Sequence, residues 1–288
     1  MTDDQVTHRL GVLGAGVMGT AIATLAIGRG VPVVLVDVDE STLERARTEV
    51  AQQLRLAQLM GRLPRTGAVG ELVTTTSLGD LAEVTDVIEA VTELPELKAK
   101  LLAEVSAVVR PGTLIVSNTS AIPVDEMAES TARPEELVGI HFMNPPYLIR
   151  TVEVIRGPRT GDRAMEQVTS LLAAFDRDGV AVGDGPGFVI NRILQRMINE
   201  AARIVEEGKA TPEAVDAVFQ GCLGHCTGPL STADLIGLDN VVDSLRVLHE
   251  RTGDNGYEPC DLLVAKVRAG DFGRKTGRGF YEHGEALS

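Results

Sequence analysis

Residues 10–19, Leu-Gly-Val-Leu-Gly-Ala-Gly-Val-Met-Gly, join a short apolar run to a glycine-rich turn. Residues 20–26, Thr-Ala-Ile-Ala-Thr-Leu-Ala, continue with the composition of a buried helix. A second apolar run, residues 31–36, stops at Asp37. A strand, a tight turn, a helix and a second strand that ends on a carboxylate match the βαβ unit that binds a dinucleotide.

Each glycine of the turn has its own expected role. Gly14 allows the tight turn, Gly16 lets backbone amides approach a pyrophosphate, and Gly19 lets the helix pack closely on the strand. The positive end of the helix then points at the phosphates. The predicted phosphate-binding residues are Gly14, Gly16, Val17, Met18 and Gly19.

Asp37 predicts which dinucleotide binds. Its carboxylate is placed to accept hydrogen bonds from the adenosine ribose, and its charge would repel the 2′-phosphate of NADP. Residues 38–40, Val-Asp-Glu, contain no arginine that could neutralise such a phosphate. We therefore predict NAD as the cofactor.

The rest of the chain shows two sequence patterns, one after the other. Apolar runs that alternate with helical segments occur at residues 86–91, 113–116, 138–142, 152–155 and 180–182. From Pro186 onward helical periodicity replaces the strands. An apolar stripe that starts at Phe188 belongs to a helix that Gly208 stops, and the rest, to about residue 269, reads as helices broken at Gly221, Gly228, Gly237 and Gly253. We predict an α/β fold, with a Rossmann-type, doubly wound parallel sheet over residues 1–185 and an all-helical C-terminal domain over residues 186–288.

Composition and charge exclude several classes of protein. The chain has 288 residues and a formal net charge of −14, which disfavours binding to nucleic acid or to an anionic membrane. The sequence shows neither a signal peptide nor a long apolar run, so we expect a cytoplasmic protein. Three cysteines do not make a disulfide framework, and the spacing of Cys222, His225 and Cys226 does not match a zinc site, so we expect no metal.

A histidine stands at the end of a predicted strand. His141 lies where open α/β sheets bind ligands, and Glu153 on the next strand is able to point back at it. An imidazole held by a carboxylate is suited to take a hydroxyl proton while hydride leaves the same carbon. The alternative is a histidine that is simply packed or exposed.

Six sequence segments together resemble the 3-hydroxyacyl-CoA dehydrogenase family across essentially the whole chain. They are residues 11–19 with Asp37, 87–91 (Val-Ile-Glu-Ala-Val), 117–120 (Ser-Asn-Thr-Ser), 141–145 (His-Phe-Met-Asn-Pro) with Glu153, 186–192 (Pro-Gly-Phe-Val-Ile-Asn-Arg) and 273–281 (Gly-Arg-Lys-Thr-Gly-Arg-Gly-Phe-Tyr). The resemblance implies reversible oxidation of a 3-hydroxyacyl thioester to its 3-oxo form. It also implies a homodimer and a substrate cleft completed by the helical domain.

The resemblance implies roles for individual residues. His141 matches the catalytic base and Glu153 its partner, while Ser120 and Asn191 match residues that hydrogen-bond the substrate. Cofactor contacts are implied for Glu93, Lys98, Asn144 and Lys275. From the residues alone, Glu93 and Lys98 are equally compatible with a helix-surface pair, Asn191 with a polar group at a helix start, and Lys275 with a solvated loop charge.

Two departures from the family pattern concern the substrate. Tyr147 and Thr151 alter the segment before Glu153, which suggests a short or polar acyl chain. Residues 41–70, which the family uses to hold coenzyme A, contain no lysine but several arginines. Arg55, Arg62 and Arg65 are predicted to dock the phosphate of the acyl tether, the alternative being a solvated amphipathic helix.

The carrier of the acyl group and the class of activity stay open at this point. The tether is coenzyme A or the phosphopantetheine of an acyl carrier protein. The second case resembles the branch that oxidises carrier-bound glyceryl-type units for methoxymalonyl polyketide extender units. Other classes are a dehydrogenase of free β-hydroxy acids, for which residues 186–203 lack the expected lysine, and a non-catalytic NAD-binding protein.

Overall fold

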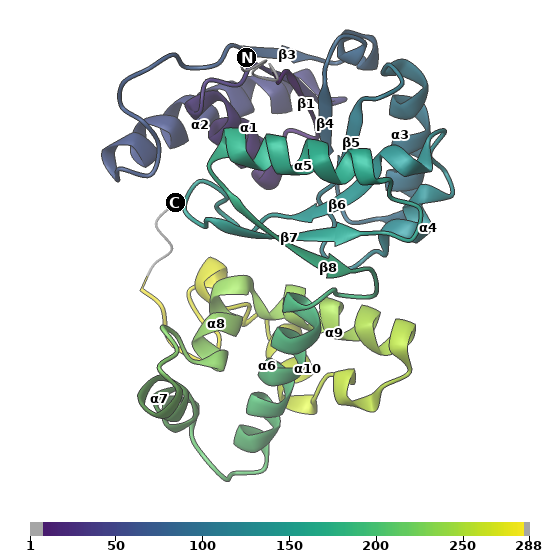
Figure 1. Cartoon of the computed structure of the whole chain (residues 1–288). Coiled ribbons are helices and arrows are strands. Elements are labelled where there is room, and N and C mark those ends of the chain that lie inside the picture. The colour runs from purple at the N-terminus through teal and green to yellow at the C-terminus, as the bar shows by residue number, and fades with distance from the viewer. Residues whose placement is uncertain (1–7, 285–288) are drawn as a thin grey trace. The chain divides into compact units, whose positions relative to one another are not determined.

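The computed structural model describes residues 8–284. The chain divides into two compact units that meet between Gly185 and Pro186. We call them unit 1 and unit 2 and describe each by itself (Figure 1).

Unit 1 is built on an eight-stranded sheet with the order β3-β2-β1-β4-β5-β6-β7-β8. The strands are β1 (Leu10–Leu13), β2 (Val33–Val36), β3 (Leu72–Thr75), β4 (Asp86–Glu89), β5 (Leu114–Ser117), β6 (Leu137–His141), β7 (Thr151–Arg156) and β8 (Asp178–Gly183). The five pairings among β1 to β6 are parallel. This Rossmann-type arrangement confirms the predicted fold class.

The last two strands correct the prediction of a wholly parallel sheet. β7 runs antiparallel to β6, and β8 runs parallel to β7. Residues 142–150 are too few for the crossover that a parallel neighbour needs, about a dozen residues or more. β3 was not predicted, because its four residues are partly exposed and only two of them are apolar.

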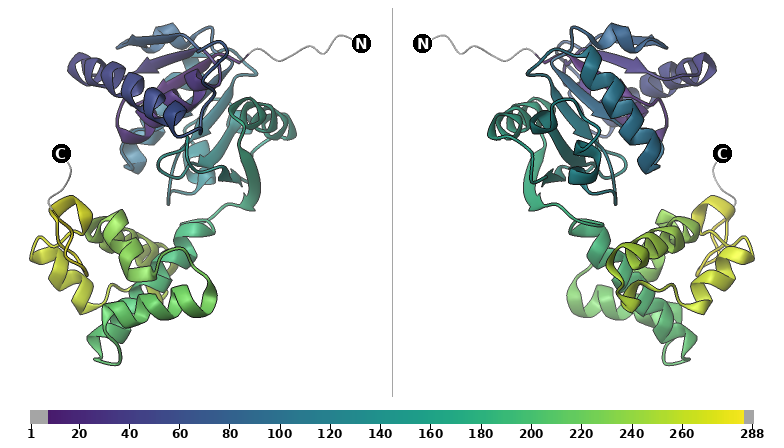
Figure 2. Two further views of the ribbon diagram at one scale, coloured as in Figure 1. Left: turned by 90° about the vertical axis from the view of Figure 1, so that its left-hand side faces the viewer. Right: turned by 90° about the vertical axis from the view of Figure 1, so that its right-hand side faces the viewer.

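Helices cover both faces of the sheet. Unit 1 contains α1 (Val17–Gly28), α2 (Glu40–Leu59), α3 (Pro95–Val108), α4 (Val124–Ala128), α5 (Asp162–Phe175) and the short 3₁₀ helices Leu78–Leu81 and Pro134–Glu136. α1, α2 and α5 share one hydrophobic cluster with the strands. Figure 2 shows α2 and α3 on opposite sides of the sheet. Because helices cover both faces of the sheet, polar groups gather where the strands begin and where they end.

Local sequence explains where α2 begins. Asp39 caps its first turn by accepting hydrogen bonds from the backbone N–H groups of Ser41 and Thr42. Hydrogen bonds from Thr42 and Ser41 lower the pKa of the Asp39 carboxyl to about 2. The cap starts the helix directly after the strand that ends at Asp37.

Unit 2 is helical, as predicted. It contains α6 (Ile190–Glu206), α7 (Pro212–Leu223), α8 (Pro229–Ile236), α9 (Leu238–Thr252), α10 (Asp261–Arg268) and the 3₁₀ helices Asn255–Tyr257 and Arg274–Thr276. Their apolar faces form one cluster around Ile198, Leu230 and Leu245. No helix in residues 8–284 is long and apolar enough to cross a membrane.

Two predicted helix boundaries in unit 2 are wrong. α6 begins at Ile190 instead of Phe188, because Phe188 adopts a left-handed conformation with a φ of 49°. α7 continues through Gly221 and ends at Leu223, where Gly224 supplies the left-handed cap. A single glycine inside a helix costs only about 1 kcal/mol, so the packing of α7 tolerates it.

Candidate active site

The glycine turn after β1 has the geometry of a dinucleotide loop. Gly14 has a φ of 93°, and a Cβ there would lie 2.9 Å from the carbonyl oxygen of Ala90. A Cβ on Gly19 would lie 1.8 Å from the carbonyl oxygen of Gly14, so α1 packs on the turn only without a side chain. A Cβ on Gly16 would meet nothing within 4 Å, so the backbone is open to a ligand there.

The start of α1 faces that open space. Gly16 is the N-cap residue and has no side chain to occupy the helix end. Val17 is 67% exposed, although the rest of α1 is almost wholly buried. Unpaired N–H groups and the positive end of the helix dipole make such an end a site for a phosphate. The residues present therefore fit the pyrophosphate of NAD.

Asp37 also supports the loop. Its Oδ2 accepts a hydrogen bond from the backbone N–H of Ala15 at 2.8 Å, and its Oδ1 accepts one from the N–H of Asp39 at 3.1 Å. The carboxylate is half-buried at the end of β2. One side chain thus fixes the turn and places negative charge at the position predicted for the ribose.

His141 and Glu153 face each other across β6 and β7. They are directly opposite in the antiparallel register, which places both side chains on one face. His141 Nδ1 lies 2.7 Å from Glu153 Oε2, and both residues are buried. Because a carboxylate only accepts, Nδ1 carries the proton, and Nε2 is the nitrogen that takes a proton from a substrate. Glu153 then stabilises the cation that forms.

The ends of β5 and β6 are tied together beside this pair. Asn118 Oδ1 accepts a hydrogen bond from the backbone N–H of Phe142 at 3.1 Å. Asn144, two residues further on, is exposed and precedes a cis peptide bond to Pro145. The structure thus places Asn144 on the loop that follows His141, at the carboxyl end of the sheet.

Glu93 holds the turn that carries Ser120. Its Oε1 accepts hydrogen bonds from Thr119 Oγ1 at 2.6 Å, from Ser120 N–H at 2.8 Å and from Ala121 N–H at 3.1 Å. Burial by itself would raise the pKa of Glu93, but the Lys98 ammonium and these hydrogen bonds outweigh it and hold the pKa below its ordinary value. Glu93 is therefore ionised at neutral pH and fixes the turn as an acceptor.

Lys98 lies beneath Glu93 and is completely buried. Its Nζ lies 2.7 Å and 2.9 Å from the two carboxylate oxygens of Glu89, and 3.1 Å from Glu93 Oε2. Glu89 is also completely buried and accepts further hydrogen bonds from Ser117 Oγ and Val91 N–H. The enclosed ammonium of Lys98 thus contacts Glu93, which in turn holds the turn that carries Ser120.

Sequence reasoning missed Glu89 and Thr119 as parts of this network. Glu89 is the last residue of β4, at the carboxyl end of the parallel strands. A charged residue at the end of a strand is the signal that could have identified it. Thr119 gave no such signal, because a hydroxyl in a loop is common. The three carboxylate–donor contacts of Glu93 depend on loop geometry that sequence spacing does not reveal.

The predicted site residues of unit 2 are described within that unit. Asn191 lies in the first turn of α6. Lys275 Nζ lies 2.5 Å from Asp239 Oδ2 and stands 5.3 Å from the ring centroid of Phe272. Lys275 is therefore held by its own unit and is about half-exposed.

The three predicted tether arginines differ in their surroundings. Arg55 and Arg65 line one surface cavity of about 340 Å³ with Gln58 and Leu59. Arg65 also donates to the backbone carbonyls of Gln58 and Leu59, at 2.8 Å and 2.7 Å, and thereby caps the end of α2. Arg62 is exposed after the end of α2. The structure thus gives Arg65 a structural task in addition to any contact with a ligand.

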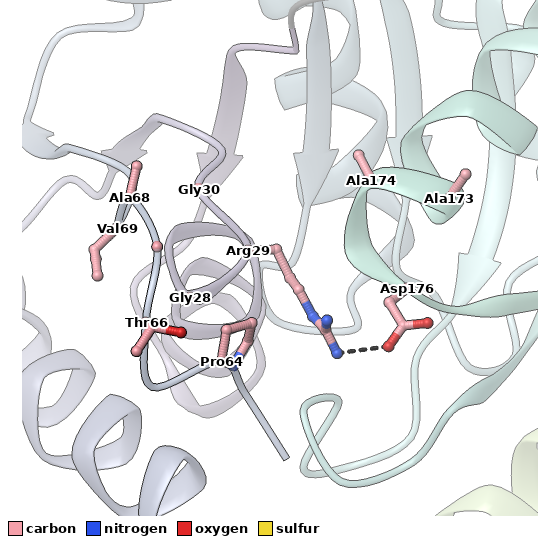
Figure 3. Close-up of a pocket in the computed structure, with 11 residues that line it drawn as sticks. Gly28, Arg29, Gly30, Pro64, Thr66, Ala68, Val69, Ala173, Ala174 and Asp176 are labelled. Atoms are coloured by element: carbon pink, nitrogen blue, oxygen red, sulfur yellow. Dashed lines mark hydrogen bonds and ion pairs between the residues drawn. The ribbon is translucent and has the colours of Figure 1, made fainter. Parts of the chain in front are cut away.

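A second cavity of unit 1, of about 450 Å³, contains none of the predicted site residues (Figure 3). It lies between the end of α1, residues 64–69 and the end of α5. Arg29 reaches Asp176 at 2.6 Å along its wall. Cavity size alone therefore does not mark the place where the dinucleotide loop and the His141–Glu153 pair lie.

Two family models match the chain and confirm the resemblance that the motifs predict. The model described as 3-hydroxyacyl-CoA dehydrogenase, NAD binding domain, matches residues 9–185. The model described as 3-hydroxyacyl-CoA dehydrogenase, C-terminal domain, matches residues 187–283.

Individual relatives agree with the family models. A probable 3-hydroxybutyryl-CoA dehydrogenase from Deinococcus radiodurans is 40% identical over 278 residues, covering 96% of this chain and 100% of that protein. The structure of FadB2 from Mycobacterium tuberculosis has a TM-score of 0.91 and 35% identity, covering 96% of this chain and 99% of that one. The crystal structure of (S)-3-hydroxybutyryl-CoA dehydrogenase PaaH1 from Ralstonia eutropha has a TM-score of 0.89 and 36% identity, covering 97% and 100%.

Proposed function

The chain belongs to the 3-hydroxyacyl-CoA dehydrogenase family, and from this membership we propose that its substrate is a short 3-hydroxyacyl thioester. It is an NAD-dependent oxidoreductase that interconverts 3-hydroxyacyl and 3-oxoacyl groups. The match of both family models in order along the chain carries this conclusion. The proposed acyl length rests on the relatives named for 3-hydroxybutyryl-CoA and on the altered segment that contains Tyr147 and Thr151.

The proposed mechanism assigns the proton and the hydride to different partners. NAD, when bound, supplies the acceptor for the hydride that leaves C3. His141 Nε2 takes the hydroxyl proton, and Glu153 stabilises the resulting imidazolium through Nδ1. Since Nδ1 is fixed by a buried carboxylate, the ring is oriented before substrate arrives, which lowers the entropic cost of reaching the transition state.

Further residues are proposed to orient the ligands. Ser120, on the turn that Glu93 holds, would bind the substrate hydroxyl, and Asn191 would bind the thioester carbonyl. Asn144, Glu93 and Lys275 are proposed to contact the cofactor. Lys98 and Glu89 are proposed as positioning residues because both are completely buried.

An NADH-oxidation assay tests the proposed function. Acetoacetyl-CoA should be reduced with NADH, whereas free acetoacetate should not, because it lacks the thioester and the phosphates of the tether. The same acyl group on an acyl carrier protein tests the alternative tether. Turnover of the free acid with no turnover of either thioester would contradict the proposal and indicate a β-hydroxyacid dehydrogenase.

We propose that the arginines at the end of α2 bind the phosphates of the tether. The double variant Arg55→Ala/Arg62→Ala should raise KM for acetoacetyl-CoA by roughly 2- to 10-fold and leave kcat unchanged, because exposed charge pairs contribute little each and act equally in the ground and transition states. Added salt should reduce the difference from wild type. Arg65 is left intact because it caps α2.

Two comparisons make this prediction specific. Arg47→Ala is the matched control, because Arg47 lies on the same helix and pairs with Glu40 at 3.4 Å. An N-acetylcysteamine thioester, which lacks the phosphates, should be indifferent to the double substitution. A fall in kcat for both full-length and truncated substrates would show that the arginines are structural. A loss confined to a carrier-protein substrate would favour that tether over coenzyme A.

The surface that we propose for the homodimer lies on α6 of unit 2. α6 presents Ile193 with 63% of its surface exposed, beside a groove of about 650 Å³ that also includes Met197, Arg196 and Tyr257. An exposed apolar stripe flanked by arginines is typical of a surface that pairs with another protein. Sedimentation of the full chain should give the mass of a dimer, and Ile193→Glu should shift it toward the monomer. A monomeric wild type would contradict the proposal.

A further inference from the structure

A serine, a histidine and an aspartate form a hydrogen-bonded chain at the amino-terminal edge of the sheet. His8 Nδ1 lies 2.8 Å from Asp86 Oδ2, and His8 Nε2 lies 2.9 Å from Ser170 Oγ. His8 comes just before β1, Asp86 begins β4, and Ser170 lies in α5. The dinucleotide loop and His141 lie at the opposite, carboxyl-terminal edge, so this cluster is separate from the dehydrogenase site.

The contacts of Asp86 set the direction of the hydrogen bonds between these three residues. Asp86 and His8 are both buried, and Thr85 Oγ1 also donates to Asp86 Oδ2, at 2.6 Å. As an acceptor, Asp86 requires the proton of the imidazole on Nδ1, which leaves Nε2 to accept from the hydroxyl of Ser170. Nucleophile, base and carboxylate are thus linked in the order used by serine hydrolases.

The hydroxyl of Ser170 borders space for a small ligand. A cavity of about 360 Å³ is lined by Ser170, His8 and Asp86 together with Thr85, Arg163, Glu166 and Gln167. Arg163 lies two turns before Ser170 on the same face of α5, and its guanidinium rests against Gly112. It supplies a cationic donor on the wall of the cavity.

We propose that Ser170 is the nucleophile of a second, acyl-accepting site that takes small activated carboxylic esters and thioesters. Ser170 Oγ attacks the carbonyl carbon while His8 Nε2 takes the hydroxyl proton. The bond to the alcohol or thiol then breaks, and the leaving group departs with that proton. Water hydrolyses the resulting acyl-serine by the reverse proton path, which releases the carboxylic acid and restores Ser170.

The expected rate is low. The backbone N–H of Ser170 lies within α5, so a pair of free amides of the kind that stabilises a tetrahedral oxyanion is not supplied by this helix. One missing donor of that kind lowers kcat by about 10²–10³-fold in serine hydrolases. The covalent intermediate is therefore a better readout than steady-state turnover.

The test is acylation of the full-length protein with p-nitrophenyl acetate. Wild type should release a burst of p-nitrophenolate and gain one acetyl group, which peptide mass spectrometry should locate on Ser170. Ser170→Ala should remove that adduct and lower the burst by at least about tenfold, because the nucleophile that takes up the acetyl group is gone. Thr169→Ala is the matched control, because Thr169 is an exposed neighbour whose hydroxyl donates to the carbonyl of Met165.

A second variant separates catalysis from structure. His8→Gln should slow acylation of Ser170 at least tenfold, whereas dehydrogenase turnover with NADH should be unchanged in both Ser170→Ala and His8→Gln. Acetyl groups confined to the exposed Cys222, Cys226 or lysines, with none on Ser170, would overturn the proposal. So would a Ser170 adduct that forms equally fast in His8→Gln, because His8 would then serve only to tie β1 to β4.

Discussion

His141→Gln is expected to lower kcat for the dehydrogenase reaction by about 10²–10⁴-fold and to leave the affinity for NAD nearly unchanged. Glutamine fills a similar volume but cannot hold the proton that the substrate hydroxyl must lose. The dinucleotide loop is built from β1, α1 and Asp37, whose carboxylate accepts from the Ala15 N–H, whereas His141 ends β6 and lies beside Glu153. The effect should therefore appear in kcat and not in cofactor binding.

The measurement is NADH oxidation with acetoacetyl-CoA, combined with a fluorescence titration of NADH. His249→Gln is a suitable control, because His249 lies in unit 2, where its Nδ1 contacts the carbonyl of Asp254. Glu153→Gln should lower kcat as well, since the imidazolium would lose its carboxylate. Full turnover in His141→Gln would remove this residue from the proposed mechanism.

The dinucleotide loop and the His141–Glu153 pair could be predicted for physical reasons. Only glycine tolerates the backbone of Gly14 and the contact between Gly19 and the Gly14 carbonyl, so the sequence had to display both residues. His141 ends β6 and Glu153 lies near the start of β7, and the short segment that joins these strands allows only the antiparallel return that sets the two residues opposite each other. Their hydrogen bond follows from that adjacency.

Other features depend on contacts between distant segments, which spacing does not reveal. The sequence gives no sign that Lys98 is buried, because a lysine in the first turns of a helix is normally exposed. Its burial depends on Glu89 at the end of a strand and Glu93 in the following turn, which close over the ammonium together. Arg65 is a similar case, because its use in capping α2 depends on how the chain turns after Leu59.

The burial of Lys98 leads to the second large effect, which is on stability. Lys98→Met should lower the free energy of unfolding by about 3–5 kcal/mol, because it leaves the Glu89 carboxylate uncompensated in the interior. Glu89→Gln/Lys98→Met should recover more than half of that loss, since the completely buried carboxylate and ammonium are removed together. Lys100→Met is the matched control, because Lys100 is exposed on the same helix, 3.9 Å from Glu104, and should change stability little.

Denaturant unfolding of the full chain measures these free energies, and kinetics of the surviving protein separates structure from positioning. The double variant restores charge balance but leaves Glu93 without the ammonium at 3.1 Å, so the turn that carries Ser120 loses part of its support. We therefore expect the double variant to fold and still to have a reduced kcat for acetoacetyl-CoA. Wild-type kcat in that variant would show that Lys98 only stabilises the fold. A loss of stability in Lys98→Met no greater than in Lys100→Met would contradict the buried ion pair itself.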